Sequence, residues 1–500
     1  MDHWESGNAS RPTVMGLEHE VGLSIDPADV LAPRESPAAA LLRLGERGSR
    51  DVVPYQYLEN GARLYVDCGE HPEYATPECS TPQELLAADC AGMAILATMA
   101  ENAERSLSDT AGKAVRVRVL RNNLAPNGES WGTHENYLAP ASLSWADLSR
   151  PLVSHLASRV CFAGAGTIIG AHGQPHGQFR LSQRAPYVGT VLSLSAVDGP
   201  TGRPMVLARD EPLADPNRYR RLQVVCGDAS MSHTATLLKL TTTMIALRLV
   251  EASRAPAVEL DRPLVAFHQW SADPDLKTTA VSSIGKMRAT DVQRQWLDAA
   301  ERYHDEQGLP AAEAVVLPLW DAVLAGLERD PDELADQLDW VAKRRVLRTL
   351  ADREGLEPDD PRLVAADLAY HDVRPDRSVF GRLLAGGRMR SLVCSAAVEQ
   401  LRDHPPASTR AATRGELVRL LRATGHNYDV TWARCRIHSI PPGVDLELSD
   451  PLSPAPDQAV AMLAALREEL ATEGPTTRTR PVAPAAPLGG LNDWWAENFG

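Results

Sequence analysis

Residues 63–78 read RLYVDCGEHPEYATPE, and this stretch carries most of the information about the fold and the site. An Asn-Gly pair stands just before it, which is typical of a turn that leads into a strand. Side chains two residues apart on a strand point to the same side of the sheet. A predicted strand over residues 60–67 therefore places Arg63, Tyr65 and Asp67 on one face.

A second predicted strand, MGLEHEVGLS at residues 15–24, places Glu18 and Glu20 on one face in the same way. Glu73 and Glu78 follow the other strand in a loop with two prolines. Carboxylates that converge on one face raise each other's pKa unless a cation lies among them. Oxygen ligands suit Mg²⁺ or Mn²⁺, and the arginine of the other strand would neutralise a nucleotide phosphate. The alternative is a set of solvated charges at a strand edge.

A second group of polar residues surrounds a glycine-containing turn. Asn122 and Asn123 precede the segment GTHENY at residues 132–137, which brings His134 and Glu135 close together. This pattern indicates either a polar site or a hydrogen-bonded loop.

Two common nucleotide-binding signatures are absent. Residues 164–170 have the spacing G-x-G-x-x-x-G, and no βαβ unit with an acidic residue follows, so a dinucleotide-binding domain is not predicted. The sequence contains no G-x-x-x-x-G-K-[ST], which excludes a P-loop.

The composition, 44% hydrophobic and 23% charged, is that of a folded chain. The net charge of −15 argues against nucleic-acid binding, which depends on Lys and Arg neutralising phosphates. The seven cysteines are scattered and form no C-x-x-C, which predicts reduced thiols in a cytoplasmic protein and neither a disulfide framework nor a zinc site.

We expect no signal peptide and no membrane span. The N-terminus is acidic and lacks an apolar segment. The most apolar helical stretch, residues 234–253, contains Lys239, Arg248 and Glu251, so we expect a buried core helix.

Five hundred residues predict about two to four domains, or one large catalytic domain with an appendage. The pattern becomes helical over residues 291–399, and a Pro-Pro pair then marks a break. Thr413 and Glu416 have capping-box spacing, which predicts a helix start at Thr413, and residues 428–437 resemble a strand. These elements predict a small C-terminal domain.

The last residues, 475–500, combine a linker rich in proline and alanine with an aromatic tail. If the tail is helical, Trp494, Trp495 and Phe499 lie on adjacent turns and offer an apolar face to a partner. The alternative is a disordered end or a self-packed helix.

Several long motifs occur in an order that resembles a known family. They are MGLEHEVG (15–22), NGARLYVDCGEHPEYATPEC (60–79), NN with GESWGTHENYL (122–138), LSQR (181–184), RDEPLADPNRYRRLQVVCGDASMS (209–232), DWVAKRRVL (339–347) and AYHDVRP (369–375). Together they resemble the Pup ligase and Pup deamidase/depupylase family, which is related to glutamine synthetase and other carboxylate–amine ligases. The similarity runs from about residue 15 to residue 445.

The resemblance implies an α+β fold in which an antiparallel, glutamine-synthetase-like sheet forms a cradle for ATP and metal, with packed helices. It implies an ATP- and Mg²⁺-binding ligase domain over residues 1–410 and a small C-terminal domain over residues 411–474. It assigns Glu18, Tyr65 and Glu73 to the metal, Arg63, Thr76 and Trp432 to ATP, and Asp67 to the catalytic base.

The resemblance also implies a reaction. The γ-phosphoryl group of ATP converts a carboxylate into an acyl phosphate, and Asp67 orients and deprotonates the attacking amine. In the family, the carboxylate is the side chain of the C-terminal Glu of the small protein Pup, and the amine belongs to a target lysine.

Within the family, the chain is more similar to the Pup–protein ligase (proteasome accessory factor A) branch. Depupylases carry a long inserted loop between the first strand and the R-L-Y-x-D strand, and this connection is short here. The family's E-T-E, S-Y-G and N-T-D read EHE, SWG and NLA here, and its N-T-R-D-E-P-H-A-D has Leu207 and Leu213 in place of Asn and His.

These differences lie at the predicted polar site and alter substrate recognition more easily than phosphoryl transfer. They leave three alternatives open. The chain is a depupylase, a paralogue that ligates a small-molecule or peptide carboxylate, or a binding protein with reduced catalysis.

Overall fold

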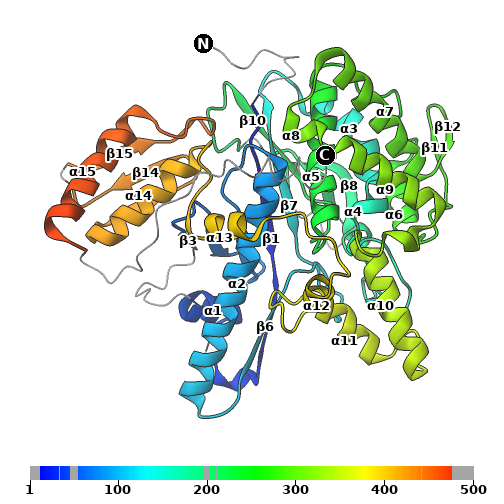
Figure 1. Cartoon of the computed structure of the whole chain (residues 1–500), viewed down its shortest axis with the longest axis horizontal. Coiled ribbons are helices and arrows are strands. Elements are labelled where there is room, and N and C mark those ends of the chain that lie inside the picture. The colour runs from blue at the N-terminus through cyan, green and yellow to red at the C-terminus, as the bar shows by residue number, and fades with distance from the viewer. Residues whose placement is uncertain are drawn as a thin grey trace.

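The computed structural model describes residues 12–32, 34–45, 55–195, 202–209, 211–440 and 442–475. A mixed sheet runs through the middle of the molecule (Figure 1). A bundle of helices lies beside one end of the sheet, and a small unit of helices and strands lies beside the other end. The aromatic residues for which we considered a docking role, Trp494, Trp495 and Phe499, lie outside the described residues.

The central sheet has eight strands. In spatial order they are β3 (Tyr55–Tyr57), β4 (Arg63–Val66), β5 (Pro72–Ala75), β1 (Met15–Glu20), β7 (Thr133–Pro140), β10 (Tyr219–Val224), β9 (Arg203–Leu207) and β8 (Val188–Ser193). Neighbouring strands are antiparallel except for β8 and β9, which are parallel.

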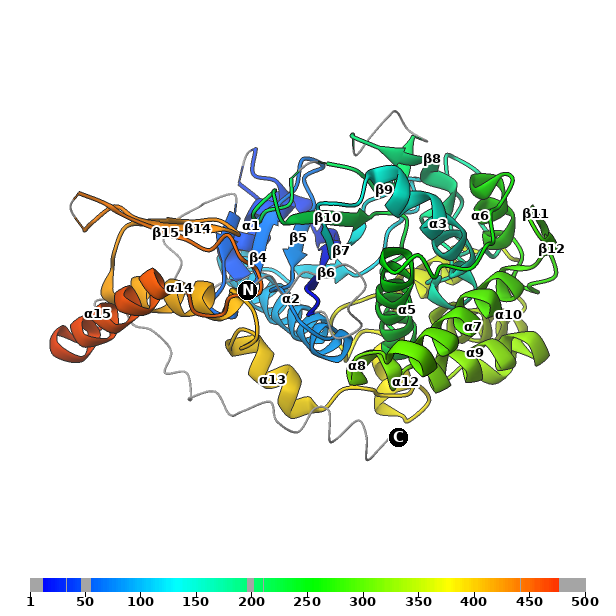
Figure 2. The ribbon, with the colours of Figure 1, turned by 90° about the horizontal axis from the view of Figure 1, so that it is seen from above.

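One face of this sheet is covered and the other is more open. Along β1, Met15, Leu17 and His19 are buried, whereas the residues between them are partly exposed. The covered face packs against α2 (Pro82–Ala111) and α5 (His233–Glu251), which lie under the sheet in Figure 2. The strand alternation expected from the sequence therefore gives β1 one apolar and one polar side.

The two helices under the sheet begin at side-chain caps. Thr81 accepts a hydrogen bond from the Glu84 amide at 3.1 Å at the start of α2, and Ser232 caps α5 in the same way. Every residue of α5 from His233 to Val250 is buried. The prediction of a buried core helix in this region is confirmed.

The sequence predicts one continuous strand over residues 15–24, but the structure has two separate strands in this region. β1 ends at Glu20, and β2 (Gly22–Asp26) pairs with β6 (Arg116–Leu120) in a separate two-stranded sheet. A Cβ atom at Gly22 would lie 2.7 Å from the ring of Trp131, so only glycine fits this close approach. The chain leaves the central sheet directly after the two carboxylates of β1.

The remaining helices pack around α2, around α5 and at the far end of the sheet. They are α1 (Pro37–Gly45), α3 (Trp145–Ser158), α4 (Val160–Ala163), α6 (Pro263–Ser271), α7 (Ala289–Gln307), α8 (Ala311–Ala314), α9 (Leu317–Arg329), α10 (Asp339–Glu354), α11 (Pro361–Tyr370), α12 (Val379–Ala385) and α13 (Ser395–Asp403), with short 3-10 turns at Ala28–Val30, Ala185–Tyr187 and Pro331–Leu334. A hairpin of β11 (Ala280–Ser282) and β12 (Gly285–Met287) lies among them.

The small unit at the other end follows α13. It consists of α14 (Ala411–Thr424), β13 (Tyr428–Val430), β14 (Arg434–Ile437), β15 (Val444–Glu447) and α15 (Asp457–Glu473). Its apolar cluster also includes Tyr57 of β3, so the unit packs against the edge of the central sheet. The domain boundaries at residues 410 and 474 stay predictions.

The predicted start of α14 was wrong. The helix begins two residues before Thr413, whose hydroxyl donates to the Pro454 carbonyl instead of capping the helix. Glu416 pairs with Arg419 and Arg467. Contacts with a distant carbonyl and with arginine side chains therefore determine the hydrogen-bond partners of Thr413 and Glu416, and the local capping pattern does not. Residues 428–437, predicted as one strand, form the hairpin of β13 and β14.

Among the described residues, no helix is both long and apolar enough to cross a lipid bilayer.

Candidate active site

The open face of the central sheet gathers the side chains that the sequence singled out. In the register of the strands, Glu20 lies opposite Glu73, which lies opposite Tyr65. Glu18 lies in the next row, which continues through Ala75 to Arg63. Alternation along three strands therefore places these charged and phenolic groups on one surface.

Four carboxylates and a histidine form a cluster on this surface. Ligand atoms of Glu18, Glu73 and His134 lie within 4.8 Å of one another, and so do those of Glu20, Asp67 and Glu73. Burial, together with the charges of Glu18 and Glu20, raises the pKa of Glu73 well above its usual value. This donor set fits a hard divalent cation such as Mg²⁺, whose charge would offset the repulsion.

Glu18 stays ionised within this cluster. Burial by itself would raise its pKa, but the hydrogen bond and charge of His134 and the charge of Arg221 lower it. His134 Nδ1 lies 3.1 Å from the Glu18 carboxylate, Gln223 donates to it at 3.1 Å, and Arg221 lies 3.7 Å away. Glu18 is therefore available as an anionic ligand.

Three of these neighbours, His134, Arg221 and Gln223, were not among the predicted site residues. His134 belongs to the predicted polar group, and Arg221 and Gln223 are two residues apart on β10. The same two-residue period that placed Glu18 and Glu20 on one face could have found them.

Glu20 is fixed by the segment that precedes β7. The Gly132 amide donates to the Glu20 carboxylate, and His134 Nε2 lies 4.0 Å from it. His134 therefore lies between Glu18 and Glu20.

Asp67 lies at the end of β4, in the turn to β5. Its Oδ1 atom accepts hydrogen bonds from the amides of Gly69 at 3.0 Å and His71 at 2.6 Å. No described residue donates a hydrogen bond to Oδ2. Burial and the charge of Glu20 raise the pKa of Asp67. One carboxylate oxygen is thus oriented by the backbone, and the other can accept a proton.

Tyr65 lies opposite Glu73 on the neighbouring strand and remains protonated. Burial and the charges of Glu18 and Glu73 raise the pKa of its phenol. Its ring also faces Arg63, whose guanidinium lies 4.3 Å from the ring centroid.

Arg63 is enclosed by aromatic rings instead of carboxylates. The rings of Tyr55 and Tyr57 lie 5.0 and 5.7 Å from its guanidinium, in addition to Tyr65. Its Nε atom is buried without a hydrogen-bond partner. A cation held this way keeps its charge available for an anionic ligand such as a phosphate group.

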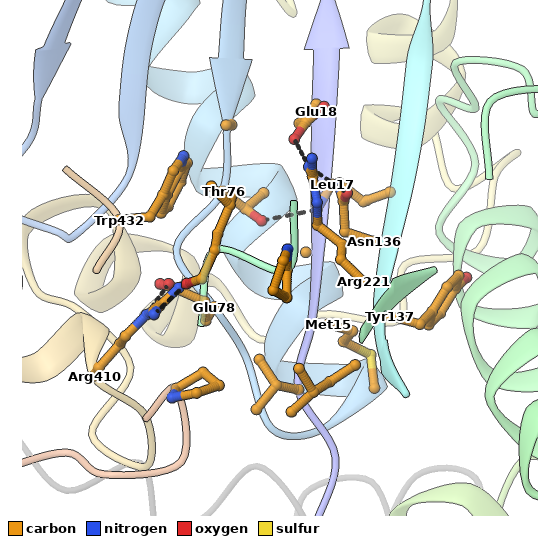
Figure 3. A pocket seen from close by; sticks show the side chains of 17 residues that line it. Met15, Leu17, Glu18, Thr76, Glu78, Asn136, Tyr137, Arg221, Arg410 and Trp432 are labelled. Carbon is orange, nitrogen blue, oxygen red and sulfur yellow. Dashed lines mark hydrogen bonds and ion pairs between the residues drawn. The ribbon is translucent and has the colours of Figure 1, made fainter. Parts of the chain in front are cut away.

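A pocket adjoins the carboxylate cluster, between the sheet and the small C-terminal unit (Figure 3). Thr76 and Trp432 line it, and Glu18 and Arg221 lie at one end of it. The Thr76 hydroxyl accepts a hydrogen bond from the Leu17 amide at 3.0 Å. Its apolar lining is made by Val14, Met15, Leu17, Leu138, Pro212, Leu213 and Pro451. An apolar pocket with an aromatic wall that leads to a cation site fits a nucleoside and its phosphates.

Glu78 lies at the other end of the pocket and does not join the carboxylate cluster, contrary to the expectation from the sequence. It accepts hydrogen bonds from Arg410 at 2.7 Å and from Arg414 at 3.0 Å. Burial would raise the pKa of Glu78, but the two arginines lower it to about 2. Arg410 also donates to the Leu213 carbonyl at 2.7 Å, and Arg414 donates to that of Trp432 at 3.2 Å.

The differences from the family motifs fall into two groups. His19 and Leu124 are buried away from the open face, and His19 Nε2 bonds to Asp89 of α2 at 2.9 Å. Trp131 and Leu213 do border the site, since the Trp131 ring lies 4.7 Å from that of His71 and Leu213 lines the pocket. The expectation that all of these differences cluster at the polar site was therefore wrong for the first two.

The polar group around residues 122–137 also divides into residues on the open face and residues in the interior. His134 and Asn136 lie on the open face, whereas Glu135 points to the covered face and pairs with Arg159 at 2.6 Å. Asn123 is buried and donates to the Thr133 hydroxyl at 3.1 Å. Both interpretations were partly right, because alternate residues of one strand serve the site and the interior.

The segment 128–132, GESWG, also matches the G-x-S-x-G pattern of hydrolase nucleophiles. That pattern needs a turn from a strand into a helix, but this segment leads into β7. The Ser130 hydroxyl accepts a hydrogen bond from Arg184 at 3.2 Å. The segment therefore lacks the geometry of a nucleophile elbow.

Comparison with protein families identifies the chain. The family model described as Pup-ligase protein matches residues 14–436. The chain belongs to this Pup-ligase family. It is 36% identical over 430 residues to the Pup–protein ligase of Acidimicrobium ferrooxidans, covering 85% of this chain and 92% of the ligase. It is 41% identical over 388 residues to the depupylase of Acidothermus cellulolyticus, covering 76% of this chain and 74% of the depupylase.

Solved structures of the family have the same fold. The complex between Pup and its ligase PafA has a TM-score of 0.83 and 30% identity, covering 93% of each chain. The structure of PafA with ADP has a TM-score of 0.76 and 30% identity, covering 85% of this chain and 92% of PafA. The resemblance and the α+β fold predicted from the sequence are confirmed.

Proposed function

We propose that this protein is an ATP-dependent carboxylate–amine ligase that joins the side-chain carboxylate of a C-terminal Glu of Pup to a protein lysine. The observation that carries the proposal is the position of Asp67, with one free carboxylate oxygen, in a cluster of carboxylates next to the pocket that Thr76 and Trp432 line. Similarity over 92% of a Pup–protein ligase supports it.

In this proposal, Thr76 and Trp432 hold the nucleoside, and Arg63 contacts the phosphates. The pocket is lined by Thr76 and Trp432, and Arg63 has no carboxylate partner among the described residues. The relative PafA has a structure in complex with ADP, which supports a nucleotide in the corresponding pocket.

Glu18, Tyr65 and Glu73 would hold Mg²⁺. Tyr65 would do so from its position opposite Glu73 on the neighbouring strand. When bound, Mg²⁺ would offset the phosphate charge of ATP during phosphoryl transfer. His134 and Arg221 keep Glu18 anionic for this purpose.

The reaction has two steps. An oxygen of the donor carboxylate attacks the γ-phosphorus of ATP, ADP leaves, and an acyl phosphate forms; Arg63 stabilises the charge on the phosphoryl group. The amine then attacks the acyl carbon and expels phosphate, which leaves an amide bond. Asp67 accepts the proton that the amine loses, because a protonated amine cannot attack.

The second candidate is a depupylase, which would hydrolyse the same bond. The 41% identity to a depupylase favours this candidate. The shorter coverage of that relative, 74%, and the short connection between β2 and β3 favour the ligase.

We also infer that the protein works in the cytoplasm. All seven cysteines are free, which is usual where glutathione and thioredoxin keep thiols reduced. The partners in this proposal are a Pup-like protein ending in Glu and a protein with an accessible lysine.

The test is intact-mass spectrometry after incubation with Mg-ATP, Pup ending in Glu and a lysine-bearing acceptor, with ADP followed in parallel. A conjugate at the summed mass minus one water, with matching ADP release, supports the proposal. Loss of Pup from a preformed conjugate identifies a depupylase. ADP release with a small carboxylate or amine, without a Pup conjugate, overturns the choice of Pup as donor.

A further inference from the structure

Three arginines lie near enough to Tyr187 for their charges to act on its phenol. They are Arg180, Arg184 and Arg203, and their charges oppose the rise in the pKa of the Tyr187 phenol that burial causes. Two of them are joined through one residue, since Arg184 donates to the Ser130 hydroxyl at 3.2 Å and Arg203 donates to its carbonyl at 2.6 Å. We call these three residues the arginine cluster.

The arginine cluster has no acidic partner among the described residues. Arg184 donates to the carbonyls of Trp131 at 2.9 Å and Val225 at 3.2 Å, and Arg180 donates to the Gln174 amide oxygen. All of these acceptors are neutral. Most other buried arginines of this acidic chain pair with a carboxylate, as Arg159 does with Glu135.

Arg184 is the most deeply buried of the three. Its side chain is 1% exposed, and its Nε atom is buried without a hydrogen-bond partner. Burial and the neighbouring charge of Arg203 lower its pKa to about 10, although the charges of Glu20 and Asp228 act in the opposite direction. A buried guanidinium without a carboxylate is unfavourable, and an anionic ligand would remove that penalty. Arg180 and Arg203 are only partly buried, so a ligand can reach them.

The arginine cluster adjoins the carboxylate cluster through one short segment. Ser130 contacts Arg184 and Arg203, and Gly132 donates to Glu20. Two residues of extended chain span at most about 7 Å. The charges of Arg184 and Arg203 also act on Glu20. A substrate at the carboxylate cluster therefore lies within reach of the arginines.

We propose that the arginine cluster binds the free α-carboxylate of the donor's C-terminal Glu while the side-chain carboxylate reacts. This inference rests on the function proposed above and adds the group that recognises the donor. A C-terminal Glu carries two carboxylates separated by a short carbon chain, and only one of them is activated. Guanidinium groups bind carboxylates through paired hydrogen bonds, so they hold the second carboxylate in a fixed position.

This arrangement also selects the donor. The acidic residues beside the reaction centre repel a donor that carries a second, uncompensated negative charge. The arginine cluster offsets that charge and thereby fixes which of the two carboxylates points to ATP. A donor that lacks the α-carboxylate leaves a buried arginine unpaired, which is the situation that gives strong discrimination.

The test compares two Pup peptides that both end in Glu, one with a free α-carboxylate and one with an α-carboxamide. We expect the wild-type protein to prefer the free acid by about 10- to 100-fold in kcat/KM. R203Q should reduce this preference to less than about 3-fold, and R203K should retain most of it because the charge remains. R105Q, on the exposed face of α2, removes the same charge and should leave the preference unchanged.

A preference for the free acid that survives in R203Q would overturn the proposal, and so would an equal loss of kcat/KM for both peptides. The second outcome would show that Arg203 supports the fold or the chemistry in general and does not recognise the α-carboxylate.

A second measurement does not depend on Pup. Glutarate has the same spacing of carboxylates as the donor residue, and glutaramate, its monoamide, lacks one of them. We expect glutarate to raise the Tm of the wild-type protein more than glutaramate does at matched ionic strength, and we expect R203Q to abolish this difference. If wild-type protein forms no Pup conjugate but shows the glutarate effect, the Pup assignment fails and the anion site stands. If glutarate and glutaramate act alike, the anion site fails whatever the result with Pup.

Discussion

Asp67 differs from the acidic residues around it in how its two oxygens are used. Oδ1 accepts two backbone hydrogen bonds, and Oδ2 accepts none from the described residues. Glu18 and Glu20, in contrast, are held by His134 and by a backbone amide. The acid that is best placed to accept a proton is therefore the one to which the family resemblance assigns the role of base.

We predict that D67N lowers kcat by about 10²- to 10⁴-fold, because an amide can accept the same backbone hydrogen bonds but cannot take the proton of the amine. ADP binding should change less than about 3-fold, since Asp67 does not line the pocket. Conjugate formation measures the first effect and isothermal titration the second. E70Q, in the same turn and exposed, is the control and should remain active. A D67N protein with normal turnover would remove Asp67 from the mechanism.

Glu73 allows a prediction in which removal of a site carboxylate stabilises the folded protein. Its pKa is raised in the folded protein, so the ionised carboxylate destabilises the metal-free protein at neutral pH, and this effect fades as pH falls through the raised pKa. E73Q should therefore raise the Tm of metal-free protein by about 1–3 °C. Mg-ATP should stabilise the wild type but stabilise E73Q much less. Equal stabilisation of both proteins by Mg-ATP would argue against Glu73 as a ligand.

At the scale of elements, Glu78 connects the central sheet with the small C-terminal unit. Its two arginine partners belong to the start of α14, and they also hold the carbonyls of Leu213 and Trp432 at the pocket wall. The buried carboxylate of Glu78 and its two arginines therefore fix the wall of the pocket by joining segments that are distant in the sequence.

We predict that E78Q destabilises the protein by about 3 kcal/mol at neutral pH, because it leaves two buried arginines without their carboxylate. The KM for ATP should rise as well, since Trp432 loses its support. Chemical denaturation and ATP kinetics measure the two effects. E416Q on α14 is the control, because Glu416 is half-buried and its partners Arg419 and Arg467 are partly exposed, and it should cost less than about 1 kcal/mol.

The same contact predicts acid sensitivity. The pKa of Glu78 is lowered to about 2 in the folded protein, so its contribution is present above the unfolded value near 4.5 and is lost as pH falls toward 2. Unfolding measured between pH 5 and pH 3 should show a steeper loss of stability in the wild type than in E78Q. Parallel curves would contradict this prediction.

Several elements could be predicted from the sequence because a local period determines them. The buried helix α5 and the strand β4 follow from their apolar and alternating patterns. The break between β1 and β2 could not, because β2 leaves the central sheet to pair with β6, which comes much later in the sequence. The predicted start of α14 was wrong because the Thr413 hydroxyl bonds to Pro454, in a distant segment, and does not cap the helix.

Across the whole molecule, one part of the candidate site comes from neighbouring strands of the sheet, and the other part comes from the small C-terminal unit. Alternation brings Arg63, Tyr65 and Asp67 together, and pairing of neighbouring strands adds Glu18 and Glu73. The pocket could not be built from periodicity, because Trp432 meets Thr76 only when the small C-terminal unit packs on the edge of the sheet. Family resemblance supplied that residue, and its role stays a prediction together with those of the other six.

We predict that ADP slows hydrogen exchange in α14 and in the β13–β14 hairpin, because nucleotide would bridge the sheet and Trp432. If residues 411–474 form a domain of their own, as we propose, these amides should be protected together. W432A should lose most of this protection, whereas V460A, an exposed position on α15, should keep it. Protection confined to the central sheet would place the nucleotide away from the C-terminal unit.

The alternation of β1 separates two kinds of residue that are neighbours in the sequence. Glu18 and Glu20 lie on the open side of the sheet, whereas His19 between them bonds to Asp89 and Thr133 in the interior. A substitution at position 19 therefore changes the packing between β1 and α2 and leaves the two carboxylates on the open side in place.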